Sequence, residues 1–99
     1  MKLKSKKKVK FGSKTIGEGE KIPFIAEIGV NHLGSKKKAF ELVDAAIEGG
    51  SDYLKFQTYI AADRYDKKNP RYKEFTKLLT DWQLTKEEEK EVWNYATSK

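Results

Sequence analysis

The sequence is most constrained by two short apolar segments that flank a helical pattern. Residues 23 to 30 form a mostly apolar run, as expected for a strand that is buried on both faces of a parallel sheet. A second short strand is predicted at residues 52 to 57, after a tight turn at Gly49 and Gly50. This order predicts a strand–helix–strand unit with adjacent parallel strands, and therefore an α/β fold.

The remaining elements are indicated by capping and turn residues. Ser35 is placed to cap the helix between the two strands, whose apolar positions recur at helical spacing: Ala39, Phe40, Leu42, Val43, Ala46 and Ile47. Short strands on either side of Gly12 predict a hairpin, which a second turn at residues 17 to 20 connects to the first main strand. A weakly patterned helix is expected after Pro70, and residues 85 to 88 fit a capping box that begins a last helix with Val92, Trp93 and Ala96 on its apolar face.

The charge is concentrated at the N-terminus. The 99 residues include 21 Lys and Arg and 15 Asp and Glu, and six of the lysines lie within the first ten residues, which contain no acid. The rest of the chain is therefore close to neutral. We expect a basic arm and β-hairpin at residues 1–22 and a folded α/β body at residues 23–99.

The chain has no cysteine, so disulfides and thiolate metal sites are excluded. No apolar run approaches the roughly 20 residues that a membrane span needs, and the N-terminus lacks the apolar core of a signal peptide. We therefore expect a soluble, cytoplasmic protein with no membrane partner.

Polar residues gather where the two main strands end. Glu27 lies inside the apolar run, where a charge is costly without a partner. By the alternation of side chains in strands, Glu27 and Lys55 project from the same face of an adjacent parallel pair. Asn31, His32 and Gln57 follow at the carboxyl ends, where ligands of α/β folds bind. The alternative at this stage is a structural salt bridge between Glu27 and Lys55.

Three motifs together resemble the N-acetylneuraminate (sialic acid) synthase family: I-A-E-I-G-V-N-H-L-G at residues 25–34, D-A-A-I-E-G-G-S-D at residues 44–52 and L-K-F-Q-T at residues 54–58. The resemblance implies an N-terminal hairpin and the first two βα units of a (β/α)₈ TIM barrel, incomplete in this chain. It also implies condensation of phosphoenolpyruvate with N-acetylmannosamine or a related N-acyl amino sugar to a nine-carbon 2-keto sugar acid, with release of phosphate.

The same resemblance implies roles for individual residues. Glu27 matches a catalytic carboxylate near the sugar and the attacking water, and Lys55 matches a catalytic lysine that binds phosphoenolpyruvate. Asn31, His32 and Gln57 match substrate-binding positions that shape the site. His32 has an alternative role, in which it orients its own loop through a backbone contact.

The resemblance further implies a divalent metal, manganese or magnesium, in a complete enzyme that is a homodimer. The metal-binding histidines of the family lie in later strands, and His32 is the only histidine of this chain and does not match them. We therefore expect the metal ligands to be absent from this chain, and the isolated chain to have no synthase activity.

Two alternatives remain at the level of sequence. A small basic module that uses residues 1–10 to bind nucleic acid is less favoured, because no base-reading motif accompanies the lysines. A related phosphoenolpyruvate-condensing or sugar-acid enzyme is also conceivable, since barrels host many reactions, but the E-I-G-V-N-H motif argues against it. The sequence does not distinguish N-acetylmannosamine from a diacetamido-dideoxy hexose as the sugar.

Overall fold

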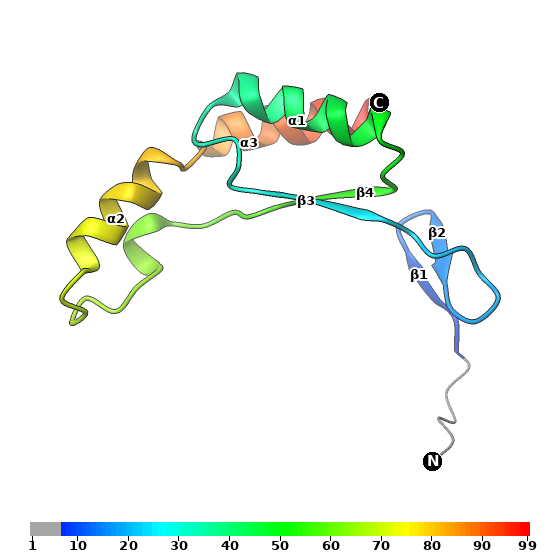
Figure 1. Ribbon diagram of the computed structural model, residues 1–99, viewed down its shortest axis with the longest axis horizontal. Helices are drawn as coiled ribbons and strands as arrows, with labels where there is room; N and C mark the ends of the chain where they lie inside the picture. Colours follow the sequence, from blue (N-terminus) through cyan, green and yellow to red (C-terminus); the bar gives the residue numbers. More distant parts are fainter. Residues whose placement is uncertain (1–6) are drawn as a thin grey trace, which may run out of the picture.

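The arrangement of the chain is an arch with a helix-covered pair of strands at its centre. The computed structural model describes residues 7–99. The elements are β1 (Val9–Phe11), β2 (Lys14–Ile16), β3 (Ile25–Gly29), α1 (Lys36–Glu48), β4 (Tyr53–Phe56), the short 3₁₀ helix η1 (Ala61–Asp63), α2 (Tyr72–Asp81) and α3 (Lys86–Thr97). Helices α1 and α3 lie side by side over one face of β3 and β4, whereas α2 and the β1–β2 hairpin extend to opposite sides (Figure 1).

The N-terminal hairpin forms as predicted. Strands β1 and β2 pair antiparallel around a turn in which Gly12 has a φ of 63°. The hairpin contacts β4 through Tyr53. The Tyr53 ring packs on Phe11, with ring centroids 4.6 Å apart, and the Tyr53 hydroxyl donates a hydrogen bond to the Phe11 carbonyl. Asp52 adds a 2.9 Å ion pair with Lys14. The domain boundary between residues 22 and 23 stays a prediction.

The central strands β3 and β4 are parallel and adjacent, which confirms the predicted strand–helix–strand unit. Their register pairs Ala26 with Leu54 and Glu27 with Lys55. It then shifts at an irregularity between Glu27 and Gly29, so that Gly29 pairs with Phe56. The sequence did not predict this irregularity, which is accommodated because Gly29 adopts a φ of 56° that favours glycine.

Helix α1 connects the two strands and supplies much of the core. Its N-terminus is capped by Ser35, whose hydroxyl accepts a hydrogen bond from the Lys38 amide, and it ends at the predicted glycine pair, where Gly50 has a φ of 82°. The buried core residues are Ile28, Ala39, Val43, Leu84 and Val92. This core cluster lies between the two strands and the α1–α3 layer, and Ala61 of η1 is buried apart from it.

The expectation that the first strand is buried on both faces is wrong. Ile25 is 48% exposed and the preceding Phe24 is 69% exposed. The reason is that α1 and α3 cover one face of a two-stranded sheet, while no helix of residues 7–99 packs on the opposite face. Trp93 was expected on the apolar face of α3 and is 66% exposed, whereas Val92 is buried.

Helix α3 begins with the predicted capping box, and this provides a stability prediction. The Thr85 hydroxyl accepts from the Glu88 amide and the Glu88 carboxylate accepts from the Thr85 amide, both at 3.1 Å. Replacing Thr85 by alanine should lower the free energy of unfolding by about 1 kcal/mol, because one N-terminal amide loses its acceptor. Urea denaturation followed by circular dichroism measures this change.

Thr80→Ala is the matched control for this prediction. The Thr80 hydroxyl donates to the Thr76 carbonyl inside α2, an interaction that contributes little to helix stability. Equal losses of stability for the two variants would contradict the capping role of Thr85.

Candidate functional site

Glu27 and Lys55 meet on the face of the sheet that the helices leave open. The Lys55 ammonium lies 3.1 Å from a Glu27 carboxylate oxygen, and the two side chains are 57% and 62% exposed. Leu54 and Phe56, on either side of Lys55, pack toward the core instead. The juxtaposition that strand parity predicted is therefore present, but the expected burial of Glu27 is wrong, because nothing in residues 7–99 covers this face.

The exposure of the pair bears on the alternative of a structural salt bridge. An ion pair between two solvent-exposed side chains contributes about 0–1 kcal/mol to folding. The Glu27–Lys55 bridge exists, but it does little to stabilise this fold. Both charged groups are consequently available to a ligand.

Asn31 and Gln57 lie at the carboxyl ends of β3 and β4, as expected. Asn31 follows β3 by two residues, Gln57 follows β4 directly, and both side chains are exposed. A Cβ atom built on Gly29 would lie 3.9 Å from the Gln57 amide group, so the Gln57 side chain lies over the irregularity of β3. Within the described chain neither residue forms a hydrogen bond with the Glu27–Lys55 pair. Their substrate-binding role stays a prediction.

His32 is separated from the other four predicted site residues. It is 3% exposed, and its Nδ1 atom accepts a hydrogen bond of 3.0 Å from the Gly34 amide. Its ring stacks on Phe56 with centroids 6.3 Å apart, on the helix-covered side of the sheet. The structure thus shows the backbone contact that was the alternative role for this residue. Burial lowers the pKa of His32, although Glu89 and Glu88 of α3 act in the opposite direction.

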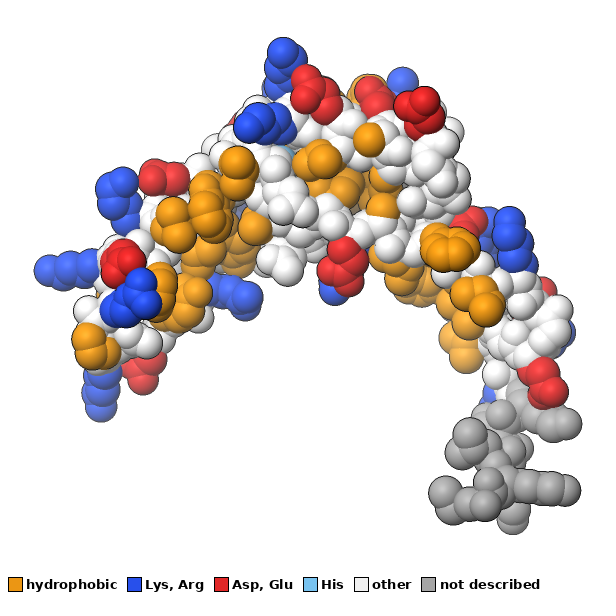
Figure 2. Space-filling view, viewed as in Figure 1, with side chains coloured by type: hydrophobic (Ala, Val, Ile, Leu, Met, Phe, Trp, Pro, Cys, Tyr) orange, Lys and Arg blue, Asp and Glu red, His pale blue; other side chains and the backbone are white. Residues whose placement is uncertain are grey.

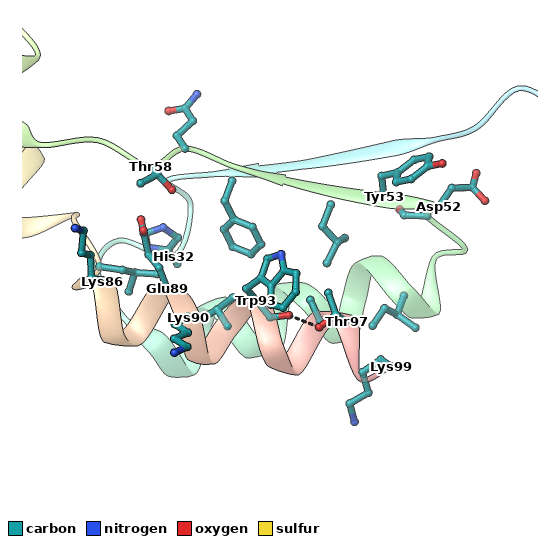
Figure 3. Close-up of a pocket in the computed structure, with 18 of the residues that line it drawn as sticks. His32, Asp52, Tyr53, Thr58, Lys86, Glu89, Lys90, Trp93, Thr97 and Lys99 are labelled. Carbon is teal, nitrogen blue, oxygen red and sulfur yellow. Dashed lines mark hydrogen bonds between the residues drawn. The ribbon is translucent and has the colours of Figure 1, made fainter. Parts of the chain in front are cut away.

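A cleft of about 990 Å³ lies between β4 and α3. Its wall includes apolar side chains such as Leu54, Phe56 and Trp93, and His32 lies at the same end as Lys86 and Glu89 (Figure 3). No motif predicts this cleft, because it is formed by side chains of elements that are far apart in the sequence.

The described residues do not fit a divalent metal site. No group of three or more histidine, cysteine or acidic residues in residues 7–99 is arranged to hold a metal ion. The only histidine of the chain is not free to bind a metal through Nδ1, because that atom accepts the hydrogen bond from the Gly34 amide. No step of a mechanism can therefore be assigned to a metal held by this part of the chain.

Within residues 7–99, no helix is both long and apolar enough to cross a membrane.

Comparisons with known proteins agree with the motifs. The chain is 47% identical over 58 residues to the spore coat polysaccharide biosynthesis protein SpsE of Bacillus subtilis, an alignment that covers 59% of this chain and 15% of that protein. It is 50% identical over 50 residues to the N,N'-diacetyllegionaminic acid synthase of Legionella pneumophila, covering 50% and 14%. An uncharacterized protein of Methanocaldococcus jannaschii is 39% identical over 89 residues, covering 90% and 25%.

A solved structure extends the likeness to the fold. The N-acetylneuraminic acid (sialic acid) synthetase of Leptospira borgpetersenii, in complex with citrate, superposes with a TM-score of 0.82 and 25% identity over 94% of this chain and 31% of that chain. These comparisons support a fragment of the sialic acid synthase family. This synthase-family segment spans between 14% and 25% of the length of the curated relatives. No family model matches it.

Proposed function

We propose that this segment forms the first two βα units of a (β/α)₈ barrel in a homodimeric, sialic acid synthase-type enzyme. The enzyme condenses phosphoenolpyruvate with an N-acyl amino sugar and releases phosphate. The observation that carries the proposal is the Glu27–Lys55 pair, which joins the first and third of the three motifs across parallel strands at 3.1 Å on an open face. A relative named as a legionaminic acid synthase and a structural neighbour named as a sialic acid synthetase support it.

The chemistry assigns complementary tasks to the two charged groups. The Lys55 ammonium binds an anionic group of phosphoenolpyruvate, leaving its present partner Glu27. The enol carbon then bonds to the aldehyde carbon of the sugar, and the aldehyde oxygen takes up a proton to become a hydroxyl. Water adds to the phosphate-bearing carbon of phosphoenolpyruvate, from which phosphate leaves. The Glu27 carboxylate lies beside that water and accepts its proton. Manganese or magnesium belongs to the proposal only as a group held outside the described residues.

The apolar surface beside the pair supports a buried environment in the complete enzyme. Ile25, which lies two residues before Glu27 on the same face of β3, is 48% exposed. Apolar patches that are open to water mark surfaces that another element or chain covers. In the proposed barrel this face is the interior, where a low dielectric strengthens the interaction of Lys55 with an anion.

A chimera tests this function. Residues 23–58 of this chain replace the corresponding segment of the Legionella synthase, and formation of N,N'-diacetyllegionaminic acid and phosphate is measured. We expect product to form in the chimera and no turnover by the 99-residue chain alone, because its described residues supply one carboxylate and one lysine but no metal-binding cluster. Turnover by the isolated chain would contradict its expected inactivity, and a folded but inactive chimera would contradict the proposed function.

The nucleic-acid alternative is not favoured. Residues 1–6 of the basic arm lie outside the described part of the chain. Within it, Lys8 is paired with Glu20 at 2.9 Å. The named relatives are proteins of polysaccharide biosynthesis and acid-sugar synthesis. The synthase function therefore remains the conclusion.

A further inference from the structure

The loop that leaves β3 is a series of tight turns built around His32. Its backbone carbonyl accepts a 2.9 Å hydrogen bond from the Ser35 amide, and its Nδ1 atom accepts from the Gly34 amide at 3.0 Å. The two residues that follow His32 adopt the left-handed backbone conformation, Leu33 with a φ of 52° and Gly34 with a φ of 79°. Because Leu33 is strained in this conformation, surrounding contacts must hold the loop in place.

Gly34 is also the point at which this loop contacts the end of α2. A Cβ atom at Gly34 would lie 2.4 Å from the Asp81 carbonyl oxygen, so the two backbones are in direct contact. The next residue, Ser35, caps α1. The His32–Gly34 bond therefore fixes a junction where the end of β3, the start of α1 and the end of α2 meet.

The protonation state of His32 follows from this bond. An imidazole nitrogen that accepts a hydrogen bond carries no proton, so the ring is neutral with its proton on Nε2. A protonated ring has no acceptor and repels the Gly34 amide. The ring cannot turn away easily, because it is buried and stacked on Phe56.

We propose that His32 is a positioning residue whose neutral imidazole fixes the turn at residues 30–34 and so sets the orientation of Asn31 at the carboxyl end of β3. Asn31 belongs to the same turn, since its amide donates to the Ile28 carbonyl at 3.0 Å and Leu33 donates to Val30 at 2.9 Å. The consequence for substrate binding rests on the proposed function, whereas the role of His32 in the turn does not.

The charges around His32 give the direction of the pH dependence. On α3, Glu88 and Glu89 favour the charged ring, while Lys86 lines the same cleft. On β4 the contact is the apolar Phe56 ring, and near Gly34 the Asp81 carboxylate is paired with Lys77 at 3.3 Å. Burial outweighs the two glutamates and lowers the pKa of His32 below 6.5. The turn is therefore complete above pH 6.5 and is lost as the pH falls below that value through the folded pKa.

Amide hydrogen exchange of the 99-residue chain, followed by NMR, tests the proposal. The variants are His32→Leu, which removes the acceptor, and His32→Asn, whose side-chain oxygen replaces Nδ1 but does not titrate. In the natural chain, we expect the Gly34 amide to lose about fivefold of its protection, corrected for intrinsic exchange, as the ring becomes protonated. His32→Leu should show this loss at every pH, and His32→Asn should retain protection at every pH.

Protection of Gly34 that is unchanged by His32→Leu, or unchanged while the imidazole titrates, would overturn the proposal. The Asn31 amide provides the second readout, since its protection against hydrogen exchange should change in parallel with that of the Gly34 amide. In the chimera, His32→Asn should restore the Michaelis constant that His32→Leu raises, with kcat little changed. A chimera without activity, together with the expected exchange pattern, would refute the proposed function but not the positioning role.

Discussion

Replacing Lys55 by alanine in the chimera is expected to lower kcat/KM for phosphoenolpyruvate by about 100-fold or more. The magnitude follows from the loss of a preorganised charged donor to an anionic substrate in a site that excludes water. The loss should lie mainly in the Michaelis constant for phosphoenolpyruvate if Lys55 acts in binding, and in kcat if it acts only in the transition state. Steady-state kinetics with phosphoenolpyruvate as the varied substrate distinguish these cases.

Lys37→Ala is the matched control, because Lys37 is 88% exposed on α1 and pairs only loosely with Glu41 at 3.9 Å. It should leave the kinetics of the chimera unchanged. The Lys55→Ala substitution should also leave the free energy of unfolding nearly unchanged, since the Glu27–Lys55 pair is exposed. Near-normal kinetics combined with a clear loss of stability would instead favour the structural salt bridge.

The second large effect is expected at Gly34. Replacing Gly34 by alanine should lower the free energy of unfolding by roughly 2–4 kcal/mol. Its φ of 79° costs about 1–2 kcal/mol with a side chain, and a Cβ atom 2.4 Å from the Asp81 carbonyl oxygen forces one of two backbones to move. Urea denaturation of the 99-residue chain measures the loss, and exchange at Asn31 reports whether the β3 loop is affected.

Gly50→Ala isolates the steric part of this prediction. Gly50 has a nearly identical φ of 82°, but a Cβ atom there would meet nothing within 4 Å. It should therefore cost only the conformational term, about 1–2 kcal/mol. If Gly34→Ala were no more destabilising than Gly50→Ala, the contact between the β3 loop and the end of α2 would not contribute to stability.

Much of the fold could be predicted from local sequence signals. Helix ends depend on residues within one turn. Ser35 and the capping box at Thr85 accept hydrogen bonds from backbone amides at the starts of α1 and α3, and the glycine pair ends α1, so these signals do not depend on distant parts of the chain. The alternation of side chains likewise predicted that Glu27 and Lys55 share a face, because parallel strands joined by a helix pair in a limited set of registers.

Exposure could not be predicted in this way. The apolar run at residues 23–30 is typical of a strand covered on both faces, yet Ile25 and Glu27 are open to water because only one helix layer is present in residues 7–99. The space-filling view shows apolar side chains gathered in several exposed patches along the arch (Figure 2). Burial depends on which elements lie opposite, and periodicity gives no information about that.

The sequence by itself determined the main helices and strands, the parallel pair, the resemblance to the synthase family and the two charged residues that face each other across the pair. The tertiary structure decided where His32 lies and what it does. Sequence adjacency grouped His32 with Asn31, but the register shift before Gly29 and the turns that follow place His32 on the helix side and leave Asn31 exposed. The physical reason is that side-chain direction in a turn depends on backbone dihedrals and on long-range contacts such as Gly34 against Asp81, which no local pattern specifies.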